Sequence, residues 1–471
     1  MACDVLLVRP RSRAICADPP PLGLGYLATH LKRAGLKTAI VDLRKPKTKP
    51  QALEEALKEH RPKVAGIQAY SRDINEVRET LELIRATLGE ACTVVAGGPH
   101  VSTFEAETFS HFPELDYAIA GEGEVSFPAL VRMVLGDGSV SPQDIPGLIY
   151  RDDGDVVVNP RRYVENLDDL GFPDRELLDV KAYRAEAFGG GFSKYAPATT
   201  ALATRGCPMN CAFCCVNSIM GRRIRVRSVE HVIEELAMLQ DRYGFREVKF
   251  VDDFFAGSKS YILSLADAYR RRGLNLAVSF ACGLHPSLIN DETLTAMKSM
   301  GVYEIQVAIE SGSNRILERI GKRITVELAF EKVKLIRRHG FSTVGYFLLG
   351  FPGETLDDIR ATIRLSRRLP LDRAHFNTFC PFPGSPIYDE LKRAGKLNGL
   401  KLEETHFENF NYSFVDGVSV KQLNRIRRRA LLGFYLRPRP IASLLSGLRR
   451  WSTFTFLLSK AMEYFGLKRT V

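Results

Sequence analysis

The chain has 471 residues, of which 45% are hydrophobic and 26% charged, and it carries nine cysteines and a formal net charge of +11. A chain of this length is too long to fold around one ordinary hydrophobic core, so we expect two or three globular domains. No uncharged apolar run reaches the roughly 18 residues that a membrane-spanning helix needs, and the first residues lack the pattern of a signal peptide. We therefore expect a cytoplasmic protein, in which an odd number of cysteines favours metal or redox chemistry over a disulfide framework.

The first part of the chain alternates short apolar runs with amphipathic stretches. Five such units predict an α/β fold with a doubly wound, Rossmann-like parallel sheet over residues 1–144. Ligands of such sheets bind beyond the carboxyl ends of the strands. In one isolated loop, Gly97 and Gly98 could serve only to turn the chain, without any role in ligand binding. The apolar runs lie at 4–10, 37–42, 63–70, 92–99 and 116–124, and the strand-end loops at 9–23, 70–73, 97–102 and 121–124.

Residues 145–198 are expected to form a linker with a hairpin at 147–160, whose turn lies at Asp152–Gly154. A second series of six strand and helix units follows and predicts a partial (β/α)6 barrel over 199–385. The remaining residues, 386–471, read as a basic, mostly helical region. The six strand-like runs lie at 199–207, 247–255, 276–283, 303–313, 342–353 and 373–379.

The positive charge is concentrated in the last 51 residues. Residues 421–471 contain 12 Lys and Arg against the single acidic residue Glu463, a net charge of +11 that equals that of the whole chain. The rest of the protein is neutral on balance, so we expect no nucleic-acid partner.

A basic amphipathic helix is predicted at the start of this tail. One face collects apolar residues and the other basic ones. The helix can pack on its own domain, or it can rest on an anionic membrane surface. The second alternative would place the protein peripherally at the inner face of the membrane and would suit an amphiphilic substrate. The apolar face consists of Leu423, Ile426, Ala430 and Phe434.

Three cysteines, Cys207, Cys211 and Cys214, have the spacing CxxxCxxC directly after the first strand of the second series. Thiolates bind zinc or iron–sulfur clusters, but a closed structural zinc site needs four ligands unless Cys215 or a distant histidine joins. A four-iron cluster held by three cysteines leaves one iron open, and an open iron can bind a small chelating molecule and deliver an electron to it. Cys215 is extra to this spacing and is more typical of a packed thiol.

This loop, with Phe213 before the last cysteine, resembles that of the radical S-adenosylmethionine (SAM) enzymes. The resemblance implies a [4Fe–4S] cluster on the three cysteines, and SAM that is cleaved reductively to a 5′-deoxyadenosyl radical. It also implies a low-potential electron donor of the flavodoxin or ferredoxin type and sensitivity to oxygen. Three strand-end motifs match those that bind the methionine amino group, the ribose and the adenine of SAM: Asp252 and Asp253; Glu310 and Ser311; Gly350 and Pro352.

The doubly wound domain placed before the cysteine loop, with its "GGPHVS" and "GEGE" segments, resembles the cobalamin-binding subclass of these enzymes. No DxHxxG stretch is present to supply a histidine to cobalt, so binding should be base-off, with Tyr70, Arg72 or His100 as candidates to cover the lower face. The residues expected to contact cobalamin are Tyr70, Ser71, Arg72, Gly97, Gly98, His100, Gly121 and Glu122.

Two kinds of chemistry use this pair of cofactors in the family. We expect methylation of an unactivated carbon through methylcobalamin. The alternative is radical ring formation, ring contraction or oxidation without methyl transfer, as in the anaerobic porphyrin-ring cyclases. Less favoured are a methylthiotransferase, for which the N-terminal domain offers only Cys3, Cys16 and Cys92, and a zinc-stabilised adaptor without enzymatic activity. The sequence identifies neither the substrate nor a catalytic acid or base.

Overall fold

The computed structural model describes residues 3–13, 19–183, 193–405 and 412–447. The chain forms two compact units. The first unit comprises Met1–Ala185, Thr199–Gly244 and Cys380–His406, and the second unit comprises Glu186–Ala198, Phe245–Phe379 and Phe407–Val471. Cys16 lies outside the described residues.

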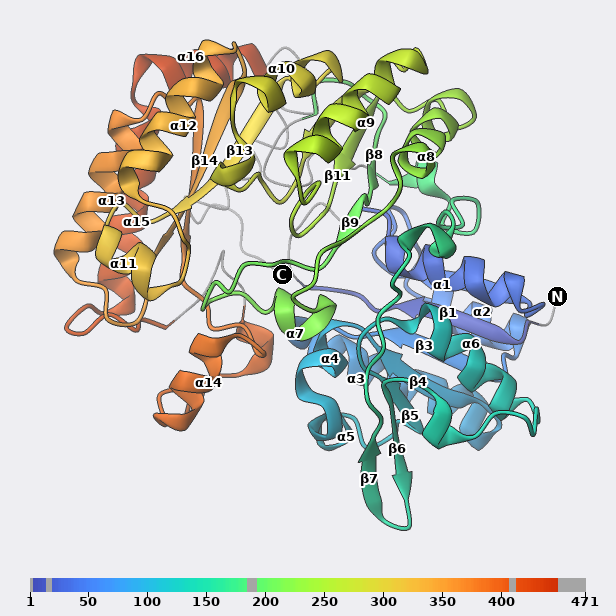
Figure 1. Cartoon of the computed structure of the whole chain (residues 1–471). Helices are drawn as coiled ribbons and strands as arrows, with labels where there is room; N and C mark the ends of the chain where they lie inside the picture. Colours follow the sequence, from blue (N-terminus) through green and yellow to red (C-terminus); the bar gives the residue numbers. More distant parts are fainter. Residues whose placement is uncertain (1–2, 14–18, 184–192, 406–411, 448–471) are drawn as a thin grey trace. The chain divides into compact units, whose positions relative to one another are not determined.

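A seven-stranded sheet with the order β2-β1-β3-β4-β5-β6-β7 forms the centre of the first unit (Figure 1). The first five strands are parallel, as predicted, and the strand order reverses between β1 and β3. Such a reversal leaves a crevice at the carboxyl ends of the two strands. The five strands are β1 (Val5–Arg9), β2 (Thr38–Asp42), β3 (Val64–Gln68), β4 (Thr93–Gly97) and β5 (Tyr117–Ile119).

Helices cover both faces of this sheet because successive side chains of a strand point to opposite sides. In β1, Leu7 packs in the apolar cluster that contains Leu24 and Phe127, whereas Leu6 packs in the cluster that contains Leu53 and Val77. The doubly wound prediction is therefore confirmed. One face carries α1 (Leu22–Arg33) and α6 (Gly123–Val134), and the other carries α2 (Ala52–His60), α3 (Ile74–Leu88) and the short α4 (Pro99–Phe104) and α5 (Thr108–His111).

The hairpin expected in the linker is an integral part of the sheet. Strand β6 (Leu148–Asp152) pairs antiparallel with β5 and with β7 (Asp155–Val158). Leu148 and Ile149 belong to opposite apolar clusters of the sheet, and this burial is the physical reason for the pairing. The sheet therefore continues beyond residue 144, where we expected the first domain to end. The connector also packs on α1, since a Cβ at Gly25 would lie 2.7 Å from Leu178 Cδ1.

Parallel strands alternate with helices in the second unit. Strand β11 (Glu247–Phe250) pairs with β12 (Ala277–Phe280), and β14 (Ser342–Leu349) pairs with both β13 (Glu304–Glu310) and β15 (Arg373–Thr378). Isolated parallel bridges join the two sets at Val278–Val302 and Leu284–Val307. The intervening helices are α9 (Lys259–Arg271), α10 (Asp291–Ser299), α11 (Asn314–Arg319), α12 (Val326–Arg338) and α13 (Leu356–Arg368). In chain order, β8 (Ala198–Ala201) and α8 (Val229–Asp241) precede them and complete the six repeats that the sequence predicted.

Helices dominate the described part of the C-terminal region: α14 (Pro386–Arg393), α15 (Val420–Tyr435) and α16 (Pro438–Gly447). Leu423, Ala430 and Phe434 of α15 are buried, and the Phe434 ring lies 6.3 Å from that of Phe376 in β15. The predicted apolar face of this helix thus packs on its own unit. In the described part of the chain, none of the helices combines the length and apolarity that a bilayer crossing requires.

Candidate functional site

The three cysteines lie on a closed loop of the first unit. Strand β9 (Thr204–Arg205) pairs antiparallel with β10 (Arg225–Val226) and closes residues 206–224, which contain α7 (Val216–Met220). Gly206 has a φ of 85°, and a Cβ there would collide with the Arg223 carbonyl oxygen, so only glycine fits. The Cys207 N–H donates to the Gly221 carbonyl at 3.3 Å, and the Cys214 N–H donates to that of Cys211 at 3.0 Å. These bonds hold the loop ends together and form a turn between the last two cysteines.

The donor set of this loop fits an iron–sulfur cluster. Cys207, Cys211 and Cys214 are all half-buried. Among the described residues, no three His, Cys, Asp or Glu side chains are gathered into a ready-made metal site. Burial raises the pKa of the nearby Cys380 thiol, and Cys215 adds to this rise. A thiol held in its protonated form is a poor metal ligand, so Cys380 is not a suitable fourth donor.

Asp252, Asp253 and Glu310 follow or end parallel strands of the second unit. Asp252 is buried and Asp253 is exposed, both directly after β11. Glu310 ends β13 at a register irregularity and has a φ of 67°. Lys322 donates from Nζ to Glu310 Oε1 at 2.9 Å, and both side chains are buried. A left-handed backbone conformation at a charged residue is costly and is typical of binding sites. Lys322 was not among the residues predicted from the sequence.

Ser311 is fully buried and orients the segment that follows β13. Its Oγ lies 3.3 Å from Thr362 Oγ1 of α13 and accepts a hydrogen bond from the Ser313 N–H at 3.2 Å. A Cβ at Gly312 would lie 2.6 Å from the Ala361 carbonyl oxygen, so the backbone lies directly against α13.

The loop after β14 folds around a buried carboxyl group. Glu354 Oε2 accepts hydrogen bonds from the backbone N–H groups of Gly350 at 2.6 Å and Phe351 at 3.0 Å. Burial raises the pKa of Glu354 to about 7, against the lowering effect of these two bonds. Arg319 Nε donates to the Pro352 carbonyl at 3.1 Å. Gly350 has a φ of 97°, which favours glycine there.

These three motifs share one rim because the carboxyl ends of parallel strands meet at the same edge. Cys282, which follows β12, joins them. Cys282 is exposed, and its thiol lies within electrostatic range of the Asp253 and Asp252 carboxylates. This cysteine was not among the residues predicted from the sequence, although its position after a strand of the barrel was a usable signal.

The loops after β3 and β4 lie together in the first unit. Gly98 has a φ of 107°, and a Cβ there would lie 3.0 Å from the Ala69 carbonyl oxygen, which also accepts the His100 N–H at 3.1 Å. Tyr70 is flanked by arginines, with the Cζ atoms of Arg44 and Arg72 5.8 and 5.9 Å from its ring centroid. The structure thus brings together the residues predicted at 70–72 and 97–100.

His100 is fully buried and both of its ring nitrogens have partners. Nδ1 lies 3.1 Å from Ser71 Oγ, and Nε2 lies 3.1 Å from His111 Nδ1. Burial, together with the nearby His111 and Arg78, lowers the pKa of His100 to about 3. The imidazole is therefore neutral, and it would have to give up a hydrogen bond to become a cobalt ligand.

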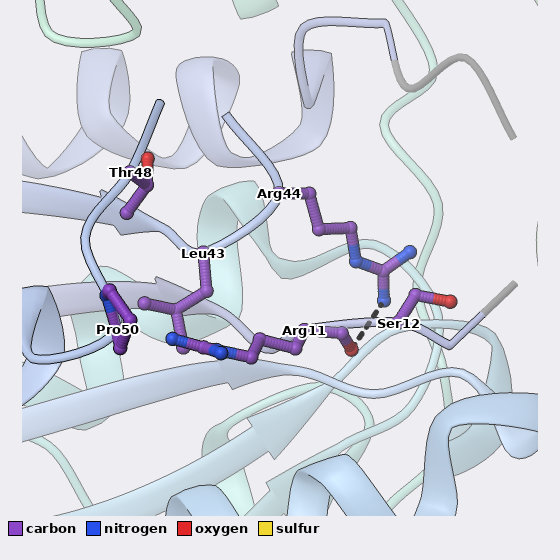
Figure 2. Close-up of a pocket in the computed structure, with 6 residues that line it drawn as sticks. All are labelled: Arg11, Ser12, Leu43, Arg44, Thr48 and Pro50. Carbon is purple, nitrogen blue, oxygen red and sulfur yellow. Dashed lines mark hydrogen bonds between the residues drawn. The ribbon is translucent and has the colours of Figure 1, made fainter. Parts of the chain in front are cut away.

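A pocket of about 290 Å³ lies after β1 and β2, at their carboxyl ends (Figure 2). Arg44 extends across it and donates from Nη2 to the Arg11 carbonyl at 3.4 Å. Arg11 and Ser12 of the strand-end loop 9–23 line it, but none of the individual residues that we predicted to contact cobalamin or SAM does. The lining residues are Arg11, Ser12, Leu43, Arg44, Thr48 and Pro50.

Glu122, which we predicted to contact a cofactor, bonds to the base of the cysteine loop. Its Oε1 accepts from Arg205 Nη1 at 3.0 Å, and its Oε2 accepts from Arg225 Nη1 at 2.8 Å and from the Val164 N–H at 2.6 Å. Burial would raise the pKa of Glu122, but Arg205 and Arg225 outweigh it and the pKa is lowered. Its neighbour Gly121 donates its N–H to Ser102 Oγ at 2.9 Å.

Comparison with known proteins defines the class of both parts of the chain. Residues 202–366 match the radical SAM superfamily, and residues 13–131 match the B12 binding domain. Enzymes of this superfamily need a reductant and a small-molecule substrate. An uncharacterized methyltransferase of Pyrococcus horikoshii is 31% identical over 447 residues, which cover 92% of this chain and 93% of the relative. The chain therefore belongs to the cobalamin-dependent radical SAM enzymes, which use a [4Fe–4S] cluster, SAM and cobalamin.

Other relatives are named for several activities. The cytidylyl-2-hydroxyethylphosphonate methyltransferase of Streptomyces wedmorensis is 27% identical and covers 83% of this chain and 82% of its own length. Relatives of lower identity include an anaerobic magnesium-protoporphyrin IX monomethyl ester cyclase and a putative methylthiotransferase. The solved structure of the radical SAM methyltransferase TsrM from Kitasatospora setae, 23% identical, has a TM-score of 0.69 and covers 83% of this chain and 76% of that one. This likeness shows the fold.

Proposed function

We propose that the protein transfers a methyl group from SAM to an unactivated carbon of a small or amphiphilic substrate. The observation that carries this proposal lies within the first unit: the cysteine loop is bonded at its base to Glu122, in a strand-end loop of the B12-binding sheet. One compact unit thus combines the thiolate donors of a radical-generating cluster with the sheet that binds a methyl-carrying cofactor. The 31% identical relative, named a methyltransferase, supports the same reaction class.

The residues have separate tasks in this proposal. When bound, the cluster, SAM and cobalamin supply the electron, the hydrogen-abstracting radical and the methyl group. Cys207, Cys211 and Cys214 ligate the cluster. The rim of the second unit orients SAM: carboxylates accept from its ammonium group, the segment after β13 holds its ribose, and the loop after β14 lies along its adenine. The rim residues are Asp252 and Asp253, Glu310 and Ser311, and Gly350 and Pro352.

Cobalamin is assigned to the strand-end loops of the first unit. Gly97 and Gly98 let the backbone approach the corrin, while Ser71 and Arg72 offer polar groups to its edge. Because both nitrogens of His100 are already hydrogen-bonded, we assign base-off binding without a histidine from this loop. Glu122 is withdrawn from the contact set, since it binds two arginines.

Isotope transfer tests the reaction without knowledge of the substrate. The protein is reconstituted anaerobically with iron, sulfide and cobalamin, reduced, and given SAM labelled in its methyl group. Label on cobalamin together with S-adenosylhomocysteine is the expected result. The related cyclases make ring formation or oxidation the second candidate, for which 5′-deoxyadenosine would form without transfer of label. If neither S-adenosylhomocysteine nor 5′-deoxyadenosine forms, both candidate reactions are overturned.

The exposed side of α15 supports a further proposal, that the protein is cytoplasmic and contacts the inner face of a membrane peripherally. Lys421, Arg425 and Arg429 are exposed at helical spacing, and Leu432 and Leu436 continue the same strip with 47% and 74% of their surface exposed. Basic residues beside exposed leucines suit anionic lipid.

Sedimentation with vesicles tests this contact. Binding to phosphatidylglycerol vesicles at low salt, its absence with phosphatidylcholine, and its loss in a Leu432→Ser, Leu436→Ser double variant are expected. Equal recovery of wild type and double variant in the supernatant would refute the contact.

We propose that reduction comes from a flavodoxin or ferredoxin, which an in vitro assay with either donor would test.

A further inference from the structure

Four buried charged side chains surround the base of the cysteine loop. Arg205 donates from Nη1 to Glu122 Oε1 at 3.0 Å and from Nη2 to Glu124 Oε1 at 2.5 Å. Arg225 donates from Nη1 to Glu122 Oε2 at 2.8 Å and to the Val164 carbonyl at 2.8 Å. None of the four side chains is more than 6% exposed. The network therefore contains two cations and two anions, balanced among themselves and shielded from water.

A network of this kind responds sharply to the loss of one member. Burying a charge is costly, and removal of one partner leaves the other charge uncompensated in a low-dielectric interior. The same loop also carries an exposed ion pair, Arg223 with Glu165 at 2.6 Å, whose side chains are 77% and 66% exposed. An exposed pair contributes little to stability. The chain thus offers a matched control of the same chemistry at nearly the same place.

The network joins two functional segments of the first unit. Arg205 and Arg225 are paired residues of the β9–β10 ladder, and Arg205 is separated from Cys207 by Gly206 alone. Glu122 and Glu124 lie where the chain passes from β5 into α6, at the carboxyl edge of the B12-binding sheet. The loop that carries the cysteines is therefore bonded at both of its ends to this edge.

A third arginine, Arg161, holds the other side of the same loop. Arg161 donates from Nη1 to the Ser218 carbonyl of α7 at 2.5 Å, and from Nη2 to the Ser102 carbonyl of α4 and to Glu105 Oε1 at 2.6 Å. Helix α4 follows Gly98 directly, so Arg161 bridges the cysteine loop and the β4 strand-end loop. Tyr163 supports the loop as well, since a Cβ at Gly221 would lie 3.2 Å from its ring.

We propose that Glu122 is a positioning residue: through Arg205 and Arg225 it fixes the orientation of the cysteine loop relative to the strand-end loops that would hold cobalamin. The inference rests on the proposed function in one respect, that the three cysteines hold the cluster. Its consequence is that the environment of the cluster depends on a carboxylate that touches neither cluster nor substrate.

Hydrogen exchange of the apoprotein is the first test. In Glu122→Gln, which keeps the size of the side chain and removes its charge, we expect the amides of residues 206–224 to exchange at least about ten-fold faster than in wild type, while those of β1 to β4 keep their rates. Glu165→Gln should leave both sets unchanged. If Glu122→Gln does not fold, Arg225→Lys serves as the second variant. It keeps the buried positive charge but loses the branched guanidinium donor, and it should give the same increase in amide exchange, confined to residues 206–224. Unchanged exchange in 206–224, or an equal increase throughout the first unit, would overturn the proposal.

Spectroscopy of the reconstituted proteins is the second test. The electron paramagnetic resonance spectrum of the reduced cluster, recorded with SAM, should differ between Glu122→Gln and wild type and be identical between Glu165→Gln and wild type. Identical spectra for all three would show that the network has a structural role only and would overturn the positioning role. Failure of the wild type to assemble any cluster would instead refute the proposed function, and the exchange experiment would still decide whether the network holds the loop.

Discussion

Lys322 and Glu310 form a buried ion pair of 2.9 Å at the rim of the second unit, where Glu310 holds a left-handed backbone conformation. The pair fixes the orientation of the carboxylate that ends β13, which we propose contacts SAM. Glu310 is the last residue of β13, and Lys322 lies twelve positions further on, beyond α11, so only packing of the second unit brings them together.

The first prediction concerns this pair. Lys322→Gln leaves the Glu310 carboxylate buried without its cation, so we expect a loss of about 3–5 kcal/mol in the free energy of unfolding, measured with urea. The control is Arg360→Gln, which breaks the exposed pair with Asp357 and should cost less than about 1 kcal/mol. Equal losses in the two variants would contradict the assignment.

The second prediction concerns the cluster ligands. Serine at Cys207, Cys211 or Cys214 removes one thiolate donor, and each variant should lose most of the iron that wild type retains after anaerobic reconstitution and desalting. Cys215→Ser, one position further along, should retain iron as wild type does. The idea fails if Cys215→Ser loses iron to the same extent as Cys214→Ser.

The third prediction is a pH dependence caused by Glu354. Its pKa in the folded protein is about 7, above the ordinary value of 4.5. Between these values the unfolded chain has released the proton that the folded protein still binds, so stability falls as pH rises from 4.5 through 7. The contribution is at most about 3 kcal/mol. Glu354→Gln cannot titrate, and its unfolding free energy should lack this decline. Parallel stability profiles for variant and wild type between pH 4.5 and 7.5 would exclude Glu354 as the cause.

The fourth prediction concerns the cobalt ligand. Both ring nitrogens of His100 are hydrogen-bonded, so the electron paramagnetic resonance spectrum of bound cob(II)alamin should show no splitting from a protein imidazole nitrogen. His100→Gln should keep cobalamin binding within about ten-fold of wild type, because the variant loses buried hydrogen bonds and not a ligand. A nitrogen splitting that disappears in His100→Gln would identify His100 as the ligand after all.

Features that depend on neighbouring residues were predictable. The five parallel strands of the first unit and the strands of the barrel series follow from short apolar runs between helical stretches, and the buried face of α15 follows from helical spacing. Local signals of this kind depend on periodicity alone. The family, its three cofactors and the enzyme class also followed from short motifs, and the comparisons confirm them.

Features that depend on residues far apart in the sequence could not be predicted. The hairpin at 147–160 was expected from its turn, but its pairing with β5 depends on burial of Leu148 and Ile149 against two faces of a sheet formed mostly by earlier residues. Glu122 was predicted to contact a cofactor because a strand-end position suggests one, whereas Arg205 and Arg225 follow it by 83 and 103 positions.

The sequence by itself therefore determined the repeating architecture, the CxxxCxxC spacing and the chemistry class, since these depend on spacing within one segment. The tertiary structure decided which polar groups have partners: Lys322 with Glu310, His100 with Ser71 and His111, and Glu122 with the two arginines. The physical reason is that a buried charge is tolerated only beside its counter-charge, and packing, not sequence spacing, brings the two together.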